Sequence, residues 1–344
     1  MAATESEGAG SDRGSDGGGG SATPSDGDGG PGGGPDDGPD DGPGDGPADG
    51  PDDGPADGPN DSTGETTSGE SGEPPVDEVE QMCARWTADR SDLSEGSWSG
   101  DVGTCESGDT SETGRANALR LVNLYRWMAD LPEVSDEASR NEGAQDCALI
   151  MDANNSLSHD PPMGWSCWSS SGASAAGSSN ISSGQGVLSV DMYMVDFGNA
   201  STLGHRRWIM SNSLGPIGLG STSGSSCMHV IGGNGSAGAS WTAYPSPGPF
   251  PLEAFDILPF GDTLDQTGWS VQSDSIELGG ASASITANGE DRPVSVTTLS
   301  PGYGSGSAIS LIPQGWTAQP DTNYHVEVVA GGETISYDVY VVDC

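Results

Sequence analysis

The sequence predicts an α+β protein in which a helical region with short strands is followed by a small all-β, Ig-like sandwich. Apolar residues recur at helical spacing within residues 76–197, whereas residues 252–344 form short alternating runs separated by Gly, Pro and Asn. Residues 1–75 contain no Ile, Leu, Val, Phe, Trp, Tyr or Cys. Because such a segment cannot offset the entropy cost of ordering its backbone, we expect a disordered acidic tail rich in Gly, Pro and Asp.

The formal net charge of -42 is concentrated in that tail. So many acidic groups would repel nucleic-acid phosphates, and the sequence has no basic cluster beyond Arg206 and Arg207, so we predict no nucleic-acid partner. No apolar run approaches the roughly 18 residues that a membrane span needs, which predicts no membrane span.

The foldable part begins with a short amphipathic helix from Val76. A loop-rich segment follows it, and Asp109 with Glu112 three residues later predicts the N-terminal cap of a second helix over residues 115–130. Pro132 is expected to end this helix, because proline cannot continue one.

Further along the chain, the spacing predicts helices over 135–154 and 187–197. The Gly/Ser-rich residues 169–186 between them are expected to be a long loop. Short strands are expected over 217–220 and 227–232.

Four prolines within residues 244–251 exclude a helix or a central strand, so this stretch is interpreted as a linker. The predicted division is a disordered tail at 1–75, a disulfide-braced cap segment at 76–112, a mainly helical domain at 113–243 and an Ig-like β-sandwich at 252–344. Strands are expected in the last part at WSVQS, SIELGG, ASITAN, PVSVTTL, AISLIP, YHVEVVA and ISYDVYVV.

The cysteines are even in number and none forms a CxxC pair, so disulfides are a better interpretation than a zinc ribbon or a redox site. Six cysteines allow 15 pairings. Sequence proximity favours Cys83 with Cys105, Cys147 with Cys167, and Cys227 with Cys344.

Disulfides indicate an oxidising compartment, so we expect a secreted or cell-surface protein. The first residues contain no signal peptide. We therefore expect that the sequence begins downstream of the true start; another export route, or reduced cysteines, are the alternatives.

Two of the four histidines are candidates for chemistry: His159 follows the second long helix, and His205 follows the third. Such a pair can hold a metal or act as a base and a hydrogen-bond donor, although a buried structural histidine is the commoner role. The sequence has no GxSxG elbow, phosphate loop or GxGxxG motif at a strand-to-helix junction, and the cysteines are assigned to disulfides. Hence no nucleophile is assigned.

Several short motifs occur in the order and spacing of one known family. They are NLYR, LSH, SNI, YMVD, GHRRWIM and IGLG, within residues 113–235. On these motifs the chain resembles the CAP superfamily, which includes cysteine-rich secretory proteins, plant pathogenesis-related proteins and many bacterial secreted proteins. The resemblance implies an α-β-α sandwich with a cleft where the motifs meet.

The resemblance also implies a site in which two histidines and two glutamates bind a divalent metal such as zinc. His159 and His205 fall on the two histidines. Ser179, before Asn180, replaces one glutamate, and Asp196 stands for the other. Two histidines and one carboxylate can still form a three-ligand zinc centre with an open position; a metal-free cleft that binds by hydrogen bonds is the alternative.

The remaining candidates are expected to be structural. Arg206 and Arg207 are expected to be a salt-bridged brace at the end of the third helix, with an anion-facing cleft edge as the alternative. Trp165, Trp168 and Trp208 are expected to be core or loop anchors, with sugar-stacking platforms as the alternative.

Taken together, these features favour a non-catalytic extracellular binding module whose cleft is lined by His159, Ser179, Asn180, Asp196 and His205. Its expected partners are a small ligand, a lipid, a divalent metal or a cell-envelope component. Two alternatives stay open: a metal-assisted, peptidase-like hydrolase, and a cell-surface structural or adhesion protein.

Overall fold

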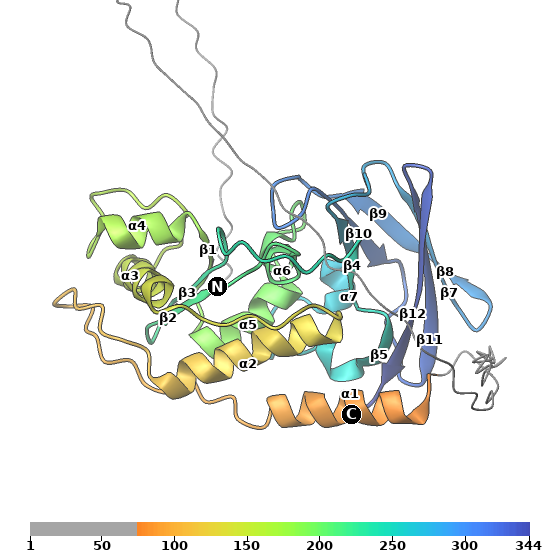
Figure 1. Cartoon of the computed structure of the whole chain (residues 1–344), viewed down its shortest axis with the longest axis horizontal. Coiled ribbons are helices and arrows are strands. Elements are labelled where there is room, and N and C mark those ends of the chain that lie inside the picture. The colour runs from red at the N-terminus through yellow and green to blue at the C-terminus, as the bar shows by residue number, and fades with distance from the viewer. Residues whose placement is uncertain (1–73) are drawn as a thin grey trace, which may run out of the picture. The chain divides into compact units, whose positions relative to one another are not determined.

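The computed structural model describes residues 74–344, which form one compact unit. The tail predicted at 1–75 lies almost entirely outside the described residues. Figure 1 shows a layered helical portion beside a portion made of two sheets, with the first helix along one side of the molecule. The α+β class, with a later all-β part, is confirmed.

The helical portion is an α-β-α sandwich around a small antiparallel sheet in the order β1-β3-β2, with strands Ser179–Ser182, Ser226–His229 and Gly218–Ser221. One face carries α2 (Glu112–Met128) and α5 (Gly186–Val195). The other face carries α3 (Ala138–Asn154) and α4 (Ser170–Ala176). The region predicted as a Gly/Ser loop thus contains α4 and β1, so that prediction was wrong; the burial of Ala175, Ala176 and Ile181 outweighs the weak local propensity of the segment.

The IGLG motif explains how closely α3 approaches the sheet. A Cβ on Gly218 would lie 2.4 Å from the main chain of Arg140, and one on Gly220 would lie 2.2 Å from the main chain of Ala144. Leu219, between the two glycines, packs into the core on the opposite side. Glycine is therefore required at both positions for this helix to pack on β2.

The first helix, α1 (Val76–Asp89), is confirmed, and a buried ionic contact joins its end to the helical layer. Arg90 donates to both carboxylate oxygens of Asp191 on α5 at 2.9 and 2.7 Å, and Tyr125 of α2 donates to the same carboxylate at 2.6 Å. Burial alone would lower the pKa of Arg90, but the neighbouring Tyr125 and Asp191 outweigh it and the net pKa is raised. Three helices are thus tied together at one carboxylate.

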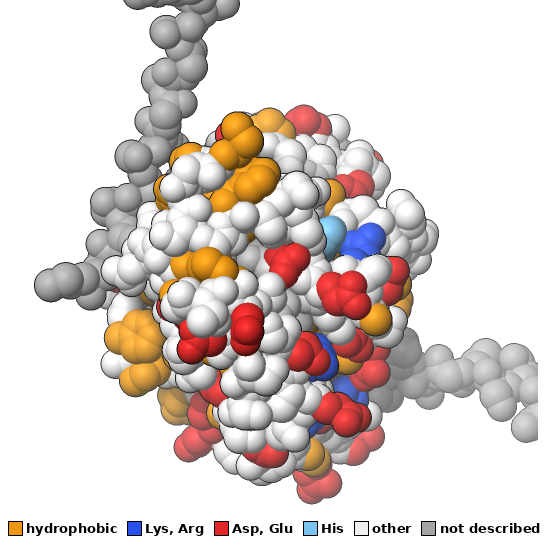
Figure 2. All heavy atoms as spheres, turned by 90° about the vertical axis from the view of Figure 1, so that its left-hand side faces the viewer, with side chains coloured by type: hydrophobic (Ala, Val, Ile, Leu, Met, Phe, Trp, Pro, Cys, Tyr) orange, Lys and Arg blue, Asp and Glu red, His pale blue; other side chains and the backbone are white. Residues whose placement is uncertain are grey.

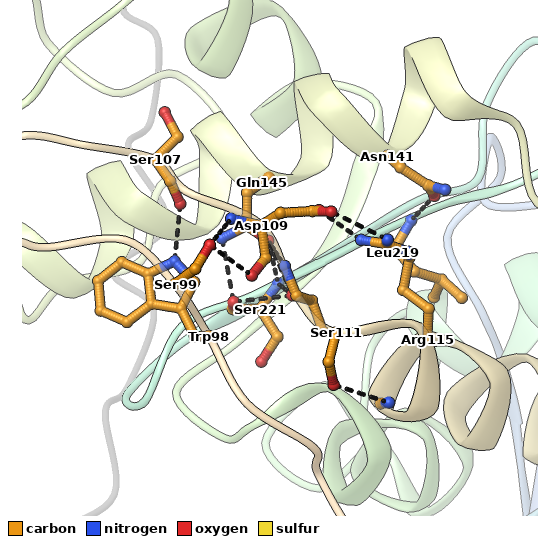
Figure 3. A network of polar contacts seen from close by, with 12 residues as sticks. Trp98, Ser99, Ser107, Asp109, Ser111, Arg115, Asn141, Gln145, Leu219 and Ser221 are labelled. Carbon is orange, nitrogen blue, oxygen red and sulfur yellow. Dashed lines mark hydrogen bonds and ion pairs between the residues drawn. The ribbon is translucent and has the colours of Figure 1, made fainter.

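The segment between α1 and α2 crosses the open edge of β2 and is held there by polar contacts (Figure 3). Trp98 donates its indole N–H to the carbonyl of Ser107 at 2.7 Å. The Thr110 hydroxyl lies 2.9 Å from the Ser221 carbonyl of β2 and accepts from the Ser221 N–H at 3.0 Å, and Gln145 of α3 accepts from the Thr110 N–H at 3.2 Å. This covers a strand edge that would otherwise have unpaired backbone groups.

The β portion consists of two sheets with the orders β4-β6-β10-β9 and β5-β12-β11-β7-β8. The parallel pair β5–β12 is the exception to their antiparallel pairing. The strands are β4 (Thr242–Tyr244), β5 (Gly248–Pro251), β6 (Trp269–Ser273), β7 (Ser282–Ala287), β8 (Glu290–Arg292), β9 (Val294–Thr298), β10 (Ser307–Pro313), β11 (Thr322–Ala330) and β12 (Glu333–Val342). The short helices are α6 (Gly204–Ile209), η1 (Leu252–Ala254) and α7 (Leu264–Thr267).

The Pro-rich stretch 244–251 contains the end of β4 and the whole of β5, each at the edge of its sheet. An edge strand tolerates proline because one side of its backbone needs no ladder hydrogen bond. SIELGG, at 275–280, is not a strand, and β8 was not predicted. A single buried apolar cluster runs from Met82 of α1 through the α2–α5 layer to Val341 of β12, so the core continues across the expected linker.

The predicted disulfide pairing was wrong at every bond. The three bonds are Cys83–Cys344, Cys105–Cys167 and Cys147–Cys227, with sequence separations of 261, 62 and 80 residues. Proximity in sequence failed because the chain brings α1 against the C-terminal strands and α3 against β3, which only the tertiary fold decides. Among residues 74–344, no helix is long and apolar enough to cross a membrane.

Candidate functional site

The candidate site forms where α5 ends and α6 begins. Asp196 ends α5 in the left-handed conformation, with φ 58°, which turns the chain toward α6. Its side chain is fully buried, and His205, one residue into α6, is 18% exposed in its side chain. The short connection therefore holds an acid and an imidazole together.

The buried carboxylate fixes the orientation of the imidazole. The Asp196 Oδ1 atom lies 2.8 Å from His205 Nδ1 and also accepts from Asn199 Nδ2 at 2.8 Å. Its Oδ2 atom accepts from the backbone N–H of Arg206 at 3.3 Å, in the first turn of α6. With Asp196 ionised, His205 carries its proton on Nδ1, and the carboxylate then stabilises both the ring orientation and any positive charge that forms on it.

Two further side chains that contact His205 come from β1 and α5. Asn180 donates its side-chain amide to the His205 carbonyl at 3.0 Å. The Tyr193 ring lies 5.1 Å from the His205 ring, and its hydroxyl donates to the Asn180 carbonyl at 3.1 Å. Burial raises the pKa of Tyr193, so its hydroxyl acts here as a neutral donor. We call His205, Asp196, Asn180, Asn199 and Tyr193 the Asp196–His205 site.

His159 and Ser179 have other hydrogen-bond partners. Ser179 donates its hydroxyl to the Ala175 carbonyl at 2.7 Å, and His159 Nδ1 lies 2.9 Å from the Ala176 carbonyl. Both side chains thus contact the C-terminal end of α4, and the His159 side chain is exposed. Of the five predicted site residues, Asp196, His205 and Asn180 are brought together by hydrogen bonds.

Asn199 and Tyr193 belong to the site but were not predicted. Asn199 follows Asp196 by three residues in a turn, a spacing that lets both side chains contact one imidazole. That spacing was the available signal for Asn199. For Tyr193 the available signal was its place at the start of the YMVD motif, but an aromatic residue inside a helix is most often part of the core.

The zinc centre that the family resemblance implies does not match the donors present. Ser179 supplies a hydroxyl, already bonded to a carbonyl, where a carboxylate is needed, and Asp196 is occupied by three donors. Among the described residues, no group of three or more His, Cys, Asp or Glu side chains is placed to hold a metal ion. The groups that this site offers are therefore hydrogen-bond donors and acceptors.

The motif arginines are structural, but not through salt bridges. Arg206 donates to the carbonyls of Met194, Val195 and Gly268 at 2.6 to 2.9 Å, and Arg207 donates to that of Ser300 at 2.7 Å. Burial lowers the pKa of both guanidinium groups to about 10. The expected salt-bridged brace is corrected to a brace made of carbonyl hydrogen bonds, which joins α5 to the β portion.

Two residues of the NLYR motif likewise hold loops. Asn123 exchanges hydrogen bonds with the backbone of Val134 at 2.9 and 2.8 Å. Arg126 donates to the carbonyls of Pro132, Ile209 and Ser211 at 2.8 to 3.0 Å. The motif therefore positions the loop after α2 and the end of α6, and through α6 it supports His205.

This part of the protein is an α-β-α sandwich with a three-stranded antiparallel sheet, and its carboxylate–imidazole pair lies where α5 ends and α6 begins. Residues 119–232 match the model of the CAP family, described as the cysteine-rich secretory protein family. This match covers most of the α-β-α sandwich and agrees with the resemblance seen in the motifs. A search of curated proteins gave no match to this chain.

Proposed function

We propose that the chain is an extracellular binding protein whose CAP domain holds a small ligand by hydrogen bonds at the Asp196–His205 site. The main support for this function is the buried Asp196 carboxylate, whose Oδ1 atom lies 2.8 Å from His205 Nδ1. A side chain fixed in this way loses little entropy when it binds, which increases affinity for a ligand with polar groups. The CAP match supports this function, because it indicates a binding protein of generally non-catalytic character.

The three disulfides support the proposed location. Bonds of this kind persist in oxidising compartments and are rare in the cytosol. We therefore place the binding function outside the cell or at its surface, where envelope components and small extracellular molecules are the available partners.

A thermal-shift screen on the full chain tests the site. The probes are a panel of small alcohols, amides and carboxylic acids, palmitate, and zinc chloride. We expect at least one organic probe to stabilise the protein, and His205→Ala to weaken its binding tenfold or more, which corresponds to about 1.4 kcal/mol. We also expect His159→Ala to weaken binding of the same probe, because the family resemblance implies that His159 lines the same cleft.

His325→Ala is the matched control, because its ring also lies beside a carboxylate, Asp338 at 3.1 Å, but on the exposed surface of the β portion. This variant should bind as the wild type does. If the probe binds both His159→Ala and His205→Ala as tightly as it binds the wild type, its site is elsewhere and the proposal is wrong. Stoichiometric zinc binding that His205→Ala abolishes would also overturn it, in favour of a metal-centred site.

A further inference from the structure

A pocket separate from the Asp196–His205 site lies between α3, the segment at Cys105 and the loop before α4. Its volume is about 420 Å³, inside the range of about 300–1,000 Å³ that is usual for small-molecule sites. The lining includes two indoles, Trp165 and Trp168, and no residue of the Asp196–His205 site. We call it the Trp165–Trp168 pocket.

The walls of this pocket are held in place by covalent and polar contacts. The Cys105–Cys167 disulfide joins two segments that line the pocket. Asn154, at the end of α3, exchanges hydrogen bonds with the backbone of Ser166 at 3.0 Å in both directions. Trp168 donates its indole N–H to the Pro161 carbonyl at 3.0 Å. The pocket is therefore preorganised for binding a ligand.

One part of the lining is apolar and open to solvent. Met163 is 80% exposed, and both Trp165 and Trp168 are partly exposed. Trp165 also packs against the small apolar cluster under α3 and α4, so it is a loop anchor as well as a lining residue. Figure 2, which views the molecule from this end, shows hydrophobic side chains in separate groups among acidic ones. Exposed aromatic and thioether surface gathered at a concave site indicates ligand binding.

The other part of the lining is polar. Ser107 donates its hydroxyl to Oδ1 of Asp146 on α3, and its carbonyl is held by Trp98, as Figure 3 shows. Within the described residues, Asp146 Oδ2 has no hydrogen-bond partner, and neither has the indole N–H of Trp165. The pocket therefore offers one free carboxylate oxygen and one free N–H donor beside its indole faces.

This combination matches the chemistry of a sugar ring. A pyranose has a C–H face that packs on an indole, while its hydroxyl edge can both donate to a carboxylate and accept from an N–H. An anionic ligand is disfavoured by Asp146 and by the net charge of -42. A quaternary ammonium group would suit the indoles and the carboxylate, but the group itself offers no acceptor to the Trp165 N–H.

We propose that the Trp165–Trp168 pocket binds a neutral mono- or disaccharide. The indole faces contact the ring, Asp146 accepts hydrogen bonds from its hydroxyls, and the Trp165 N–H donates to one of them. The sequence favoured loop anchors over sugar-stacking platforms for these tryptophans, and the proposal takes up that second alternative.

Calorimetric titration of the full chain tests the proposal. The probes are neutral sugars of gluco, galacto and manno configuration, their N-acetylamino forms and β-linked and α-linked disaccharides, with choline chloride as the competing ligand class. We expect saturable binding of at least one sugar, with a Kd of about 1 mM or below. Asp146→Asn and Trp168→Ala should each weaken it fivefold or more.

Two further variants separate binding from folding. Met163→Ala changes an exposed side chain that no fold contact requires, and we expect it to weaken the same sugar about twofold. Trp127→Ala removes an indole that lies beneath Arg85 at 5.3 Å, outside the pocket, and should leave sugar binding unchanged. Binding of no sugar in the panel, binding of choline alone, or sugar binding that persists in both Asp146→Asn and Trp168→Ala would each overturn the proposal. None of these results bears on the Asp196–His205 site, which shares no residue with this pocket.

Discussion

At the scale of single residues, the most informative side chain is Arg206, because it is fully buried and has no carboxylate hydrogen-bonded to its guanidinium. Two of its acceptors are the carbonyls of Met194 and Val195 at the C-terminal end of α5, which have no partner within the helix. A third is the Gly268 carbonyl in the β portion. Arg206 thus pairs with the free carbonyls at the C-terminal end of α5 and joins this helix to the β portion.

Replacing this side chain tests the brace. We expect Arg206→Met to lower the free energy of unfolding by about 3 kcal/mol or more, since three buried carbonyls lose their donors. Denaturant unfolding of the two proteins measures the difference. Arg292→Met is the control: its ion pair with Glu290 is on the surface at 3.7 Å, and we expect a loss below about 1 kcal/mol. Equal losses in both variants would contradict the brace.

At the scale of secondary structure, the start of α2 shows how a motif can predict a helix correctly and its cap wrongly. The sequence favoured Asp109, but the N-cap is Ser111, whose hydroxyl accepts from Gly114 N at 3.4 Å and from Ser97 N at 3.0 Å. Asp109 instead binds Arg115 with both oxygens on the surface. The backbone of residues 97–111 decides which residue reaches the cap, and that path is set by its contacts with α3 and β2.

The two roles predict different costs of mutation. We expect Ser111→Ala to destabilise the protein by about 1 to 2 kcal/mol, because the substitution removes a helix cap and a loop contact together. Asp109→Ala should cost less than about 1 kcal/mol, because an exposed ion pair contributes little. Thermal unfolding of both variants distinguishes the roles, and a larger loss for Asp109→Ala would restore the original assignment of the cap.

At the scale of the whole molecule, the described chain is one packed unit. The apolar cluster extends from α1 to β12, Arg206 and Arg207 donate to carbonyls of the β portion, and the Cys83–Cys344 disulfide ties α1 to the C-terminus. The division at residues 244–251 stays a prediction about domains, but packing continues across it.

This continuity predicts how the protein unfolds. In calorimetry we expect a single heat-absorption peak, because neither portion can lose its packing without exposing the core of the other. Cys83→Ala combined with Cys344→Ala should lower its midpoint, with a loss of about 2–5 kcal/mol, since the disulfide closes a loop with a sequence separation of 261. The peak should stay single in this variant. Two resolved peaks in the wild type would show that the portions unfold independently.

Local patterns in the sequence were enough to predict the α+β class, the helices at α1, α2, α3 and α5 and most strands of the β portion. Each of these follows from hydrophobic period and from turn residues over a few neighbouring positions, so no knowledge of distant contacts is needed. The CAP resemblance likewise rested on short motifs, and it placed Asp196 and His205 as site residues.

Contacts between distant segments decided the rest. The pairing of the cysteines depends on segments far apart in the chain, and so does the formation of α4 and β1 in a Gly/Ser-rich stretch. The contact between α3, which carries Asp146, and the loop before α4, which carries both indoles, is likewise decided by the tertiary structure. Hydrophobic period specifies an element and its buried face, but the packing of one element on another is selected by the free energy of the whole core, which no short window of sequence contains.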